Sequence, residues 1–173
     1  MNIVTSRLIL IPVSENHIKD IYINFNEKVI SYMIPSVAKD IDETRQVVKK
    51  FIDQRKNNTD YVYAITLKNN GEFIGVVGLH DLKEGVAKLG IWTKITSHNN
   101  HYGREAVGGM IEYGSKVGLK RLLYPVDRRN IPSKKIPLFY GGKLVVDYKE
   151  VQTPDGRILE EEIYEIEIEE KRF

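Results

Sequence analysis

The side chains best suited to chemistry lie where a run typical of a strand gives way to a run typical of a helix. This junction reads "SHNNHYGR", so it offers imidazoles, carboxamides, a phenol and a guanidinium within one short loop. The first amides of a helix have no partner inside the helix, and the helix dipole favours negative charge at that end. A junction of this kind is where an α/β protein often holds an anion, so the question is whether this loop holds one, with its histidines facing the anion.

Two other interpretations of the histidines stay open at this point. His98 and His101 have an i,i+3 spacing that could ligate a metal. However, a third histidine is not close to them in the sequence, so we predict no metal site. The two rings could also be solvent-exposed loop side chains without any ligand.

The strands before the junction are expected to form an antiparallel meander. "DYVYAITLK" and "EFIGVVGLHDL" flank "NNG", which is a hairpin signal because Asn and Gly tolerate positive φ. A third strand, "VAKLGIWTKI", follows a turn at Gly85.

The strand after the junction is expected to run parallel to the strand before it. A helix starting near Gly103 separates "GIWTK" from "RLLYPV", and a strand–helix–strand crossover of this kind gives a parallel pair. Ligands of such sheets bind at the carboxyl ends of the parallel strands, beside the following helix. The polar junction falls at that place.

The rest of the chain supplies helices and an outer hairpin. "RLILIPV", interrupted by Pro12, is typical of an edge strand. Three helical segments should follow, namely one capped by Ser14, one in "NEKVISYMIPS", and one opened by a capping box of Asp40 and Glu43. A short helix in "SKKIPLFYGGK" and two strands, "LVVDYKEVQTPD" and "ILEEEIYEIEIEE", close the chain. We predict an α/β (α+β) fold over residues 1–173, a single domain whose mixed, mostly antiparallel sheet has a parallel pair in the middle and helices on both faces.

Composition restricts the class of protein. The chain has 173 residues, 42% hydrophobic and 29% charged, as in ordinary globular domains. A formal net charge of +2 does not indicate nucleic acid or an anionic membrane as partner, and no apolar run is long enough for a transmembrane helix. Without cysteine, disulfides and thiolate nucleophiles are excluded. The opening residues show no signal-peptide pattern, so we expect a cytoplasmic monomer or homodimer.

Several motifs together resemble the GNAT superfamily of acyl-CoA-dependent N-acetyltransferases, in particular the branch of the ribosomal-protein N-terminal (Rim-type) acetyltransferases. Each match alone is unspecific, but their order and spacing extend over nearly the whole chain. The motifs are "TSRLIL", "GEFIGVVGL", "GIWTKITSHNNHYGREAV", "DRRNIPSKKIPLFYGGK" and "DGRILEEEIYEI".

The resemblance implies acetyl-CoA as co-substrate. The cofactor's diphosphate would lie on the loop from His98 to Arg104, and its pantetheine arm would pair with the free end of the strand at Trp92 and Thr93, where the next strand diverges. The residues implied in cofactor binding are Trp92, Thr93, His98, Asn99, Asn100, His101, Tyr102, Gly103, Arg104, Asn130 and Ser133.

The loop departs from the family pattern of Q/R-x-x-G-x-G/A. Of its usual glycines only Gly103 is present, and His101 occupies a glycine position where its ring would narrow the diphosphate seat. Asn is the best non-glycine residue for left-handed backbone, so we expect that conformation at Asn99 and Asn100.

The resemblance also implies the catalytic groups. Ser133 would protonate the leaving thiolate, because the family's frequent tyrosine position is Pro137 here; Tyr140 is a reserve. Glu150 is the nearest equivalent of the family's base. Ser133 could instead only cap a helix, and Glu150 could be a solvated strand residue.

The resemblance implies an N-acetyltransferase that moves an acetyl group from acetyl-CoA to a primary amine, either a protein N-terminus or a small amine. The alternative is a GNAT-like binding or interaction module without catalysis, which the missing glycines and Pro137 would favour.

Overall fold

The computed structural model of the protein describes residues 1–169. The predicted domain ends at residue 173 and the predicted last strand ends at residue 170. Residues 170–173 lie outside the described part. The strands are β1 (Ile3–Val4), β2 (Leu8–Pro12), β3 (Tyr61–Leu67), β4 (Phe73–Lys83), β5 (Val86–Thr93), β6 (Arg121–Asp127), β7 (Lys143–Gln152) and β8 (Ile158–Glu167). The α-helices are α1 (Ile18–Asn24), α2 (Ile41–Lys56), α3 (Tyr102–Lys116) and α4 (Ile131–Phe139), and the 3₁₀ turns are η1 (Glu15–His17), η2 (Val29–Tyr32) and η3 (Ile95–Ser97).

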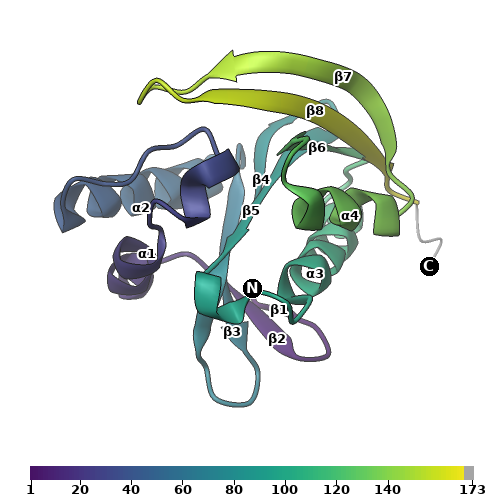
Figure 1. The fold of residues 1–173 in the computed structure, drawn as a ribbon. Coiled ribbons are helices and arrows are strands. Elements are labelled where there is room, and N and C mark those ends of the chain that lie inside the picture. The colour runs from purple at the N-terminus through teal and green to yellow at the C-terminus, as the bar shows by residue number, and fades with distance from the viewer. Residues whose placement is uncertain (170–173) are drawn as a thin grey trace.

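All eight strands join in one mixed sheet, in the order β1-β2-β3-β4-β5-β6-β8-β7 (Figure 1). Within residues 1–169, β5 and β6 form the sole parallel pair, and every other pairing is antiparallel. The predicted mixed sheet with a central parallel pair is therefore confirmed.

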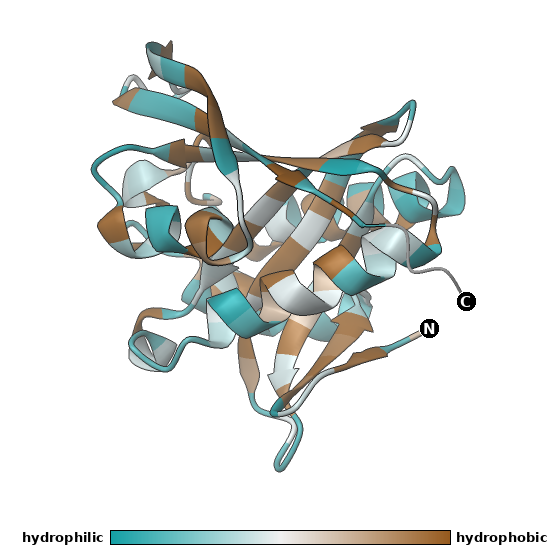
Figure 2. Cartoon of the chain, turned by 90° about the vertical axis from the view of Figure 1, so that its right-hand side faces the viewer, coloured by the Kyte–Doolittle hydropathy of each residue, from teal (hydrophilic) through white to brown (hydrophobic). Residues whose placement is uncertain are grey.

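The helices cover both faces of the sheet, α1 and α2 on one side and α3 and α4 on the other (Figure 1). Successive strand residues point to opposite faces, so the sheet has an apolar core on each side. The larger core lies beneath α3 and includes Leu8, Tyr63, Leu79, Met110 and Leu122. The smaller core lies beneath α1 and α2 and includes Val13, Ile18, Val48 and Val62. Figure 2 shows apolar residues concentrated along the central strands, while loops and hairpin ends are largely hydrophilic.

Two expected elements differ from the structure. The opening strand is not an edge, because the two-residue strand β1 folds back and pairs with it, Ile3 opposite Leu10. The helix expected in "NEKVISYMIPS" is only the 3₁₀ turn η2, which ends at Tyr32 ahead of Pro35. A short segment that must end before a proline has no room for repeated i→i−4 bonds, so the tighter turn forms.

Candidate active site

The loop that opens α3 has left-handed backbone at two of its residues. Asn99 has φ 67° and His101 has φ 58°. The prediction for Asn99 agrees with this geometry, but the prediction for Asn100 is wrong, because the second left-handed residue is His101. Left-handed backbone is costly for most side chains, so the loop keeps a glycine-like path at the position where the sequence carries His101.

The side chains of this loop also hold its own backbone. Asn100 Nδ2 donates to the carbonyl oxygens of Ser97 and His98, both at 3.1 Å. His98 Nε2 lies 3.1 Å from the carbonyl oxygen of Thr93 at the end of β5. His98 and Asn100 therefore fix the loop shape and connect it to the strand.

The start of α3 presents amides that have no partner within the helix. The first helical bond runs from the Glu105 amide to the His101 carbonyl at 3.1 Å. The amides of Tyr102, Gly103 and Arg104 precede it and remain open at the helix end. A Cβ at Gly103 would lie 3.6 Å from both Ile91 and Ile136, so Gly103 borders the space between β5 and α4.

An ionic contact near the opening motif holds α3 against β2. Glu105 accepts hydrogen bonds from the Thr5 hydroxyl and the Arg7 amide, each at 2.7 Å, and pairs with the Arg7 guanidinium at 2.6 Å. Burial opposes ionisation of Glu105, but these hydrogen bonds dominate, so its pKa is lowered. Sequence reasoning did not single out Glu105. The available signal for a polar partner was the presence of Thr5 and Arg7 beside the apolar residues of the opening motif.

The parallel pair opens shortly after it begins. β5 and β6 are in register only from Val86 opposite Arg121 to Lys88 opposite Leu123. Beyond Lys88, β5 keeps its partner β4 as far as Thr93 opposite Gly75. The β5 edge that faces β6 is therefore free of strand pairing up to Thr93, as the family resemblance implied.

The Trp92 side chain packs on the sheet face that α1 and α2 cover, behind the open edge of β5. Its ring packs against Phe25 and Phe73, with centroid distances of 5.1 and 5.9 Å. A Cβ at Gly75 would lie 2.1 Å from the Trp92 carbonyl oxygen, so only glycine fits beside this part of β5. The indole is a packing group, while the Trp92 backbone borders the gap.

Ser133 lies on α4 and contacts a buried tyrosine of β6. The hydroxyl groups of Ser133 and Tyr124 are 2.8 Å apart. Burial raises the pKa of Tyr124 to about 12, with the Ser133 contact acting in the opposite direction. Asn130 caps α4, since its Oδ1 accepts from the Ser133 amide at 3.4 Å. Sequence reasoning did not single out Tyr124. The alternation of side chains in "RLLYPVD", which points Tyr124 toward the core, was the available signal.

Tyr140 and Arg104 tie α4 to α3. The Tyr140 hydroxyl donates to the Arg104 carbonyl oxygen at 2.6 Å, so it already has an acceptor. The Arg104 guanidinium lies over the Phe139 ring, 4.3 Å from its centroid. Pro137 is buried within α4.

Glu150 lies apart from these groups, on the outermost strand β7. It is exposed, and its carboxylate accepts from the Tyr148 hydroxyl at 3.0 Å. Within residues 1–169, the Glu150 side chain forms this one hydrogen bond. The bond does not connect Glu150 with any other predicted site residue.

The β7–β8 hairpin reaches across to the segment between α1 and α2. Arg157 donates to the carbonyl oxygens of Ile30 at 2.6 Å and Pro35 at 3.1 Å. Arg129 lies 5.5 Å from the ring centroid of Tyr32. The hairpin and this segment thus border one side of the sheet together, on the face opposite α3 and α4.

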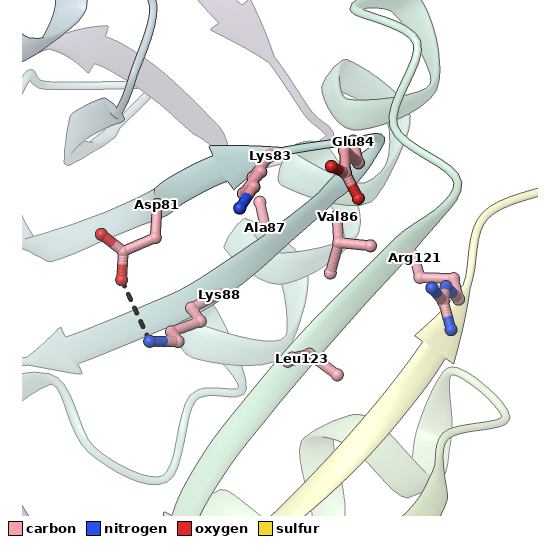
Figure 3. Close-up of a pocket in the computed structure, with 8 residues that line it drawn as sticks. All are labelled: Asp81, Lys83, Glu84, Val86, Ala87, Lys88, Arg121 and Leu123. Carbon is pink, nitrogen blue, oxygen red and sulfur yellow. Dashed lines mark hydrogen bonds and ion pairs between the residues drawn. The ribbon is translucent and has the colours of Figure 1, made fainter.

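Two pockets flank β5. One of about 500 Å³ is lined by Asn26, Glu27, Lys28 and Ile95, just after the end of β5. The other, of about 310 Å³, lies at the opposite end of the strand (Figure 3), and is lined by Asp81, Lys83, Glu84, Val86, Ala87, Lys88, Arg121 and Leu123.

Over residues 1–169, the structure contains no group of three or more His, Cys, Asp or Glu side chains that could hold a metal ion. In the same residues, no helix has the length and apolar character required to cross a membrane.

Solved structures share this architecture at low sequence identity. The RimL ribosomal L7/L12 α-N-protein acetyltransferase in complex with coenzyme A is similar with a TM-score of 0.86 and 17% identity, covering 99% of this chain and 100% of that one. An acetyl transferase from Salmonella typhimurium, which modifies the N-terminal serine of L7/L12, has a TM-score of 0.85 and 16% identity over 98% and 100%. Spermidine N-acetyltransferase from Vibrio cholerae, in complex with CoA and spermine, has a TM-score of 0.83 and 16% identity over 95% and 97%. No curated protein matches the chain by sequence.

A family model described as an acetyltransferase (GNAT) domain matches residues 7–143. This span begins at the residue that anchors α3 and continues through the open parallel pair and α4. The match confirms the resemblance read from the motifs. On this basis the chain belongs to the GNAT acetyltransferase family.

Proposed function

We propose that the protein transfers an acetyl group from acetyl-CoA to a primary amine. The observation that carries this proposal is the gap between β5 and β6, which starts after Lys88 and leads to the open amides of Tyr102, Gly103 and Arg104. A free strand edge can pair with the amide groups of pantetheine, and helix-terminal amides can hold a diphosphate.

The proposed cofactor site uses the residues expected from the sequence. The segment 98–104 would hold the diphosphate, and the backbone of Trp92 and Thr93 would pair with the pantetheine. Asn130 and Ser133 would border the thioester from α4. The loop's left-handed residues support this, because they let the backbone follow a glycine-like path around an anion.

Acyl transfer also requires polarisation of the thioester carbonyl and a proton for the departing sulfur. Amides at the free edge near Trp92 can stabilise the oxyanion. Ser133 would donate to the sulfur while its oxygen accepts from Tyr124, whose hydroxyl is 2.8 Å away. Tyr124 keeps its proton at neutral pH because burial raises its pKa to about 12.

The acceptor and the base that receives its proton belong to the opposite face. The helices that would bind the cofactor, α3 and α4, lie on one face of the sheet (Figure 1). The amine would therefore approach from the face of α1 and α2, which the β7–β8 hairpin borders. Glu150, on that hairpin, is one candidate base. The acceptors named for the similar structures, an N-terminal serine and spermine, support a peptide N-terminus or a polyamine as substrate.

A combined binding and transfer experiment tests the function. Acetyl-CoA is titrated calorimetrically, and a panel containing spermine and a peptide with an N-terminal serine is assayed for acetylation by mass spectrometry. We expect binding near micromolar affinity and acetylation of at least one acceptor. Gly103→Trp should abolish both, because an indole would fill the space between Ile91 and Ile136.

Val117→Trp serves as the matched control, because it adds the same side chain at an exposed position beyond the other end of α3. Absence of binding at millimolar acetyl-CoA would contradict the proposal. Binding without transfer to any acceptor would favour the non-catalytic module.

A further inference from the structure

A histidine–aspartate pair lies on the sheet face opposite α3, outside the cofactor site. His80 Nδ1 on β4 is 2.9 Å from Asp60 Oδ2, just before β3. The Asp60 side chain is 4% exposed, whereas that of His80 is 31% exposed. A buried carboxylate thus holds a ring that solvent and small molecules can reach.

Two glycines make room for this ring. A Cβ at Gly78 would lie 2.7 Å from His80 Nε2, and a Cβ at Gly90 would lie 3.3 Å from the same atom. Gly78 and Gly90 face each other across β4 and β5. A side chain at either position would press on Nε2, so this end of the imidazole occupies the space that the two glycines leave free.

The ring leans toward the open end of the parallel pair. The β4–β5 register passes from His80 opposite Lys88, through Gly78 opposite Gly90, to Val76 opposite Trp92. Residues two apart on a strand share a face and are about 7 Å apart. Since β5 and β6 part after Lys88, Gly90 borders the gap, and Nε2 lies above it, one step from the Trp92 backbone.

The hydrogen bond to Asp60 sets the chemistry of the ring. An anionic carboxylate accepts from Nδ1–H, which leaves the lone pair of neutral imidazole on Nε2. Within residues 1–169, no hydrogen bond links Nε2 to another group. Nε2 is therefore an acceptor without a hydrogen-bond partner in these residues, and it lies beside Gly78 and Gly90 on the face that we assign to the acceptor.

Groups from β5 and α2 surround the partly exposed His80 side chain. Lys88, opposite His80, pairs with Asp81 at 3.1 Å, as Figure 3 shows, so its ammonium is held by a carboxylate. From α2, the Phe51 ring faces the imidazole with a centroid distance of 6.4 Å. Lys88, the strand partner of His80, is therefore already paired with a carboxylate.

We propose that His80 is the general base of acetyl transfer and that Asp60 orients it. This rests on the proposed function. As the amine nitrogen attacks the thioester carbon, the C–N bond forms and Nε2 takes the amine proton. The C–S bond then breaks and the sulfur is protonated by Ser133, while His80 returns its proton to solvent and Ser133 regains one. The net reaction moves one proton from nitrogen to sulfur.

Chemical rescue distinguishes a base from a structural residue. With the acceptor of the panel that wild type acetylates fastest, His80→Ala should lower kcat by about 10²-fold or more, the usual size of a general-base contribution. The acetyl-CoA affinity should not change. Added imidazole should restore kcat at least about tenfold, because the substitution removes an imidazole ring from the space above Gly78 and Gly90. A merely structural histidine would not respond.

Asp60→Asn tests the positioning role. It keeps the size of the side chain but loses the charge that fixes the tautomer, so kcat should fall at least about tenfold with little change in KM. Melting curves with and without acetyl-CoA verify that each variant folds and binds. His17→Ala is the control, because it removes a histidine at the start of the N-terminal helices, away from His80 in the sequence. The activity of the His17→Ala variant should be independent of imidazole.

The outcomes separate this inference from the proposed function. Wild type that acetylates no acceptor overturns both. Wild type that acetylates an acceptor, while His80→Ala retains its kcat or loses it without rescue by imidazole, overturns the role of His80 alone. Loss of kcat in Glu150→Gln with full activity in His80→Ala would assign the base to Glu150 instead.

Discussion

At the residue scale, the pair formed by Ser133 and Tyr124 links α4 to β6 beside the gap. Tyr124 is 2% exposed, so its hydroxyl has no solvent to bond and depends on Ser133. When Tyr124 donates, the Ser133 hydroxyl proton is free to point into the gap. Two hydroxyl groups in series thus form a short donor chain, which polarises the terminal proton more than serine alone.

Removing either hydroxyl should slow the chemical step and leave cofactor binding intact. We expect Ser133→Ala to retain less than about a tenth of wild-type kcat, and Tyr124→Phe to lose about fivefold to tenfold. The double variant should lose no more than Ser133→Ala, because Tyr124 acts through that serine. Steady-state kinetics with measured acetyl-CoA affinity would check this; additive losses would contradict the donor chain.

At the element scale, the position of α3 depends on a polar anchor and not on packing alone. Glu105 in its first turn binds Thr5 and Arg7, and the Arg7 guanidinium also lies 4.7 Å from the Tyr102 ring centroid. The anchor therefore fixes the helix end that carries the open amides. It connects the opening motif of the chain with the cofactor loop.

The anchor predicts a pH-dependent contribution to stability. The pKa of Glu105 is lowered from 4.5, so its ionised form stabilises the fold above the unfolded value, and this stability is lost as pH falls through the folded pKa. Glu105→Gln should lower the free energy of unfolding by about 1–2 kcal/mol at pH 7. The difference from wild type should vanish in acid. Denaturant titrations at pH 7 and pH 3 would measure it; an equal difference at both pH values would argue against the anchor.

At the scale of the whole molecule, the β7–β8 hairpin and the segment between α1 and α2 are connected through Arg157. Its guanidinium bonds to the Ile30 and Pro35 carbonyl oxygens and to Asp155. These contacts hold together the two walls of the face that we assign to the acceptor. The proposed cofactor site lies with α3 and α4 on the other face, so cofactor binding should be insensitive to these contacts.

Releasing this connection should affect the acceptor and not the cofactor. Arg157→Ala should raise the acceptor KM about fivefold, the equivalent of one hydrogen bond, with an unchanged acetyl-CoA Kd. Arg45→Ala is a suitable control, because Arg45 is exposed on α2 and its ion-pair partner among residues 1–169 is Asp42, three residues away. Kinetics and calorimetry on both variants provide the test; a weakened acetyl-CoA Kd in Arg157→Ala would contradict the division of faces.

The β3–β4–β5 meander and the parallel pair of β5 and β6 were predictable from sequence, because hairpin signals such as "NNG" and the strand–helix–strand order are local. Contacts between distant residues were not. Glu105 meets Thr5, and Asp60 meets His80, only after the sheet has formed. The left-handed backbone of His101 was missed for another reason, since residue preference favours Asn and the loop geometry overrides it.

The central claim is that the amides of Tyr102, Gly103 and Arg104 hold the diphosphate of coenzyme A. The most direct measurement is the amide NMR spectrum of ¹⁵N-labelled protein during titration with coenzyme A and, separately, with pantetheine, which lacks the diphosphate. We predict that these three amides shift strongly with coenzyme A and hardly with pantetheine, while amides near Thr93 respond to both. Unmoved signals from the three amides at saturating coenzyme A, or equal shifts with pantetheine, would contradict the account.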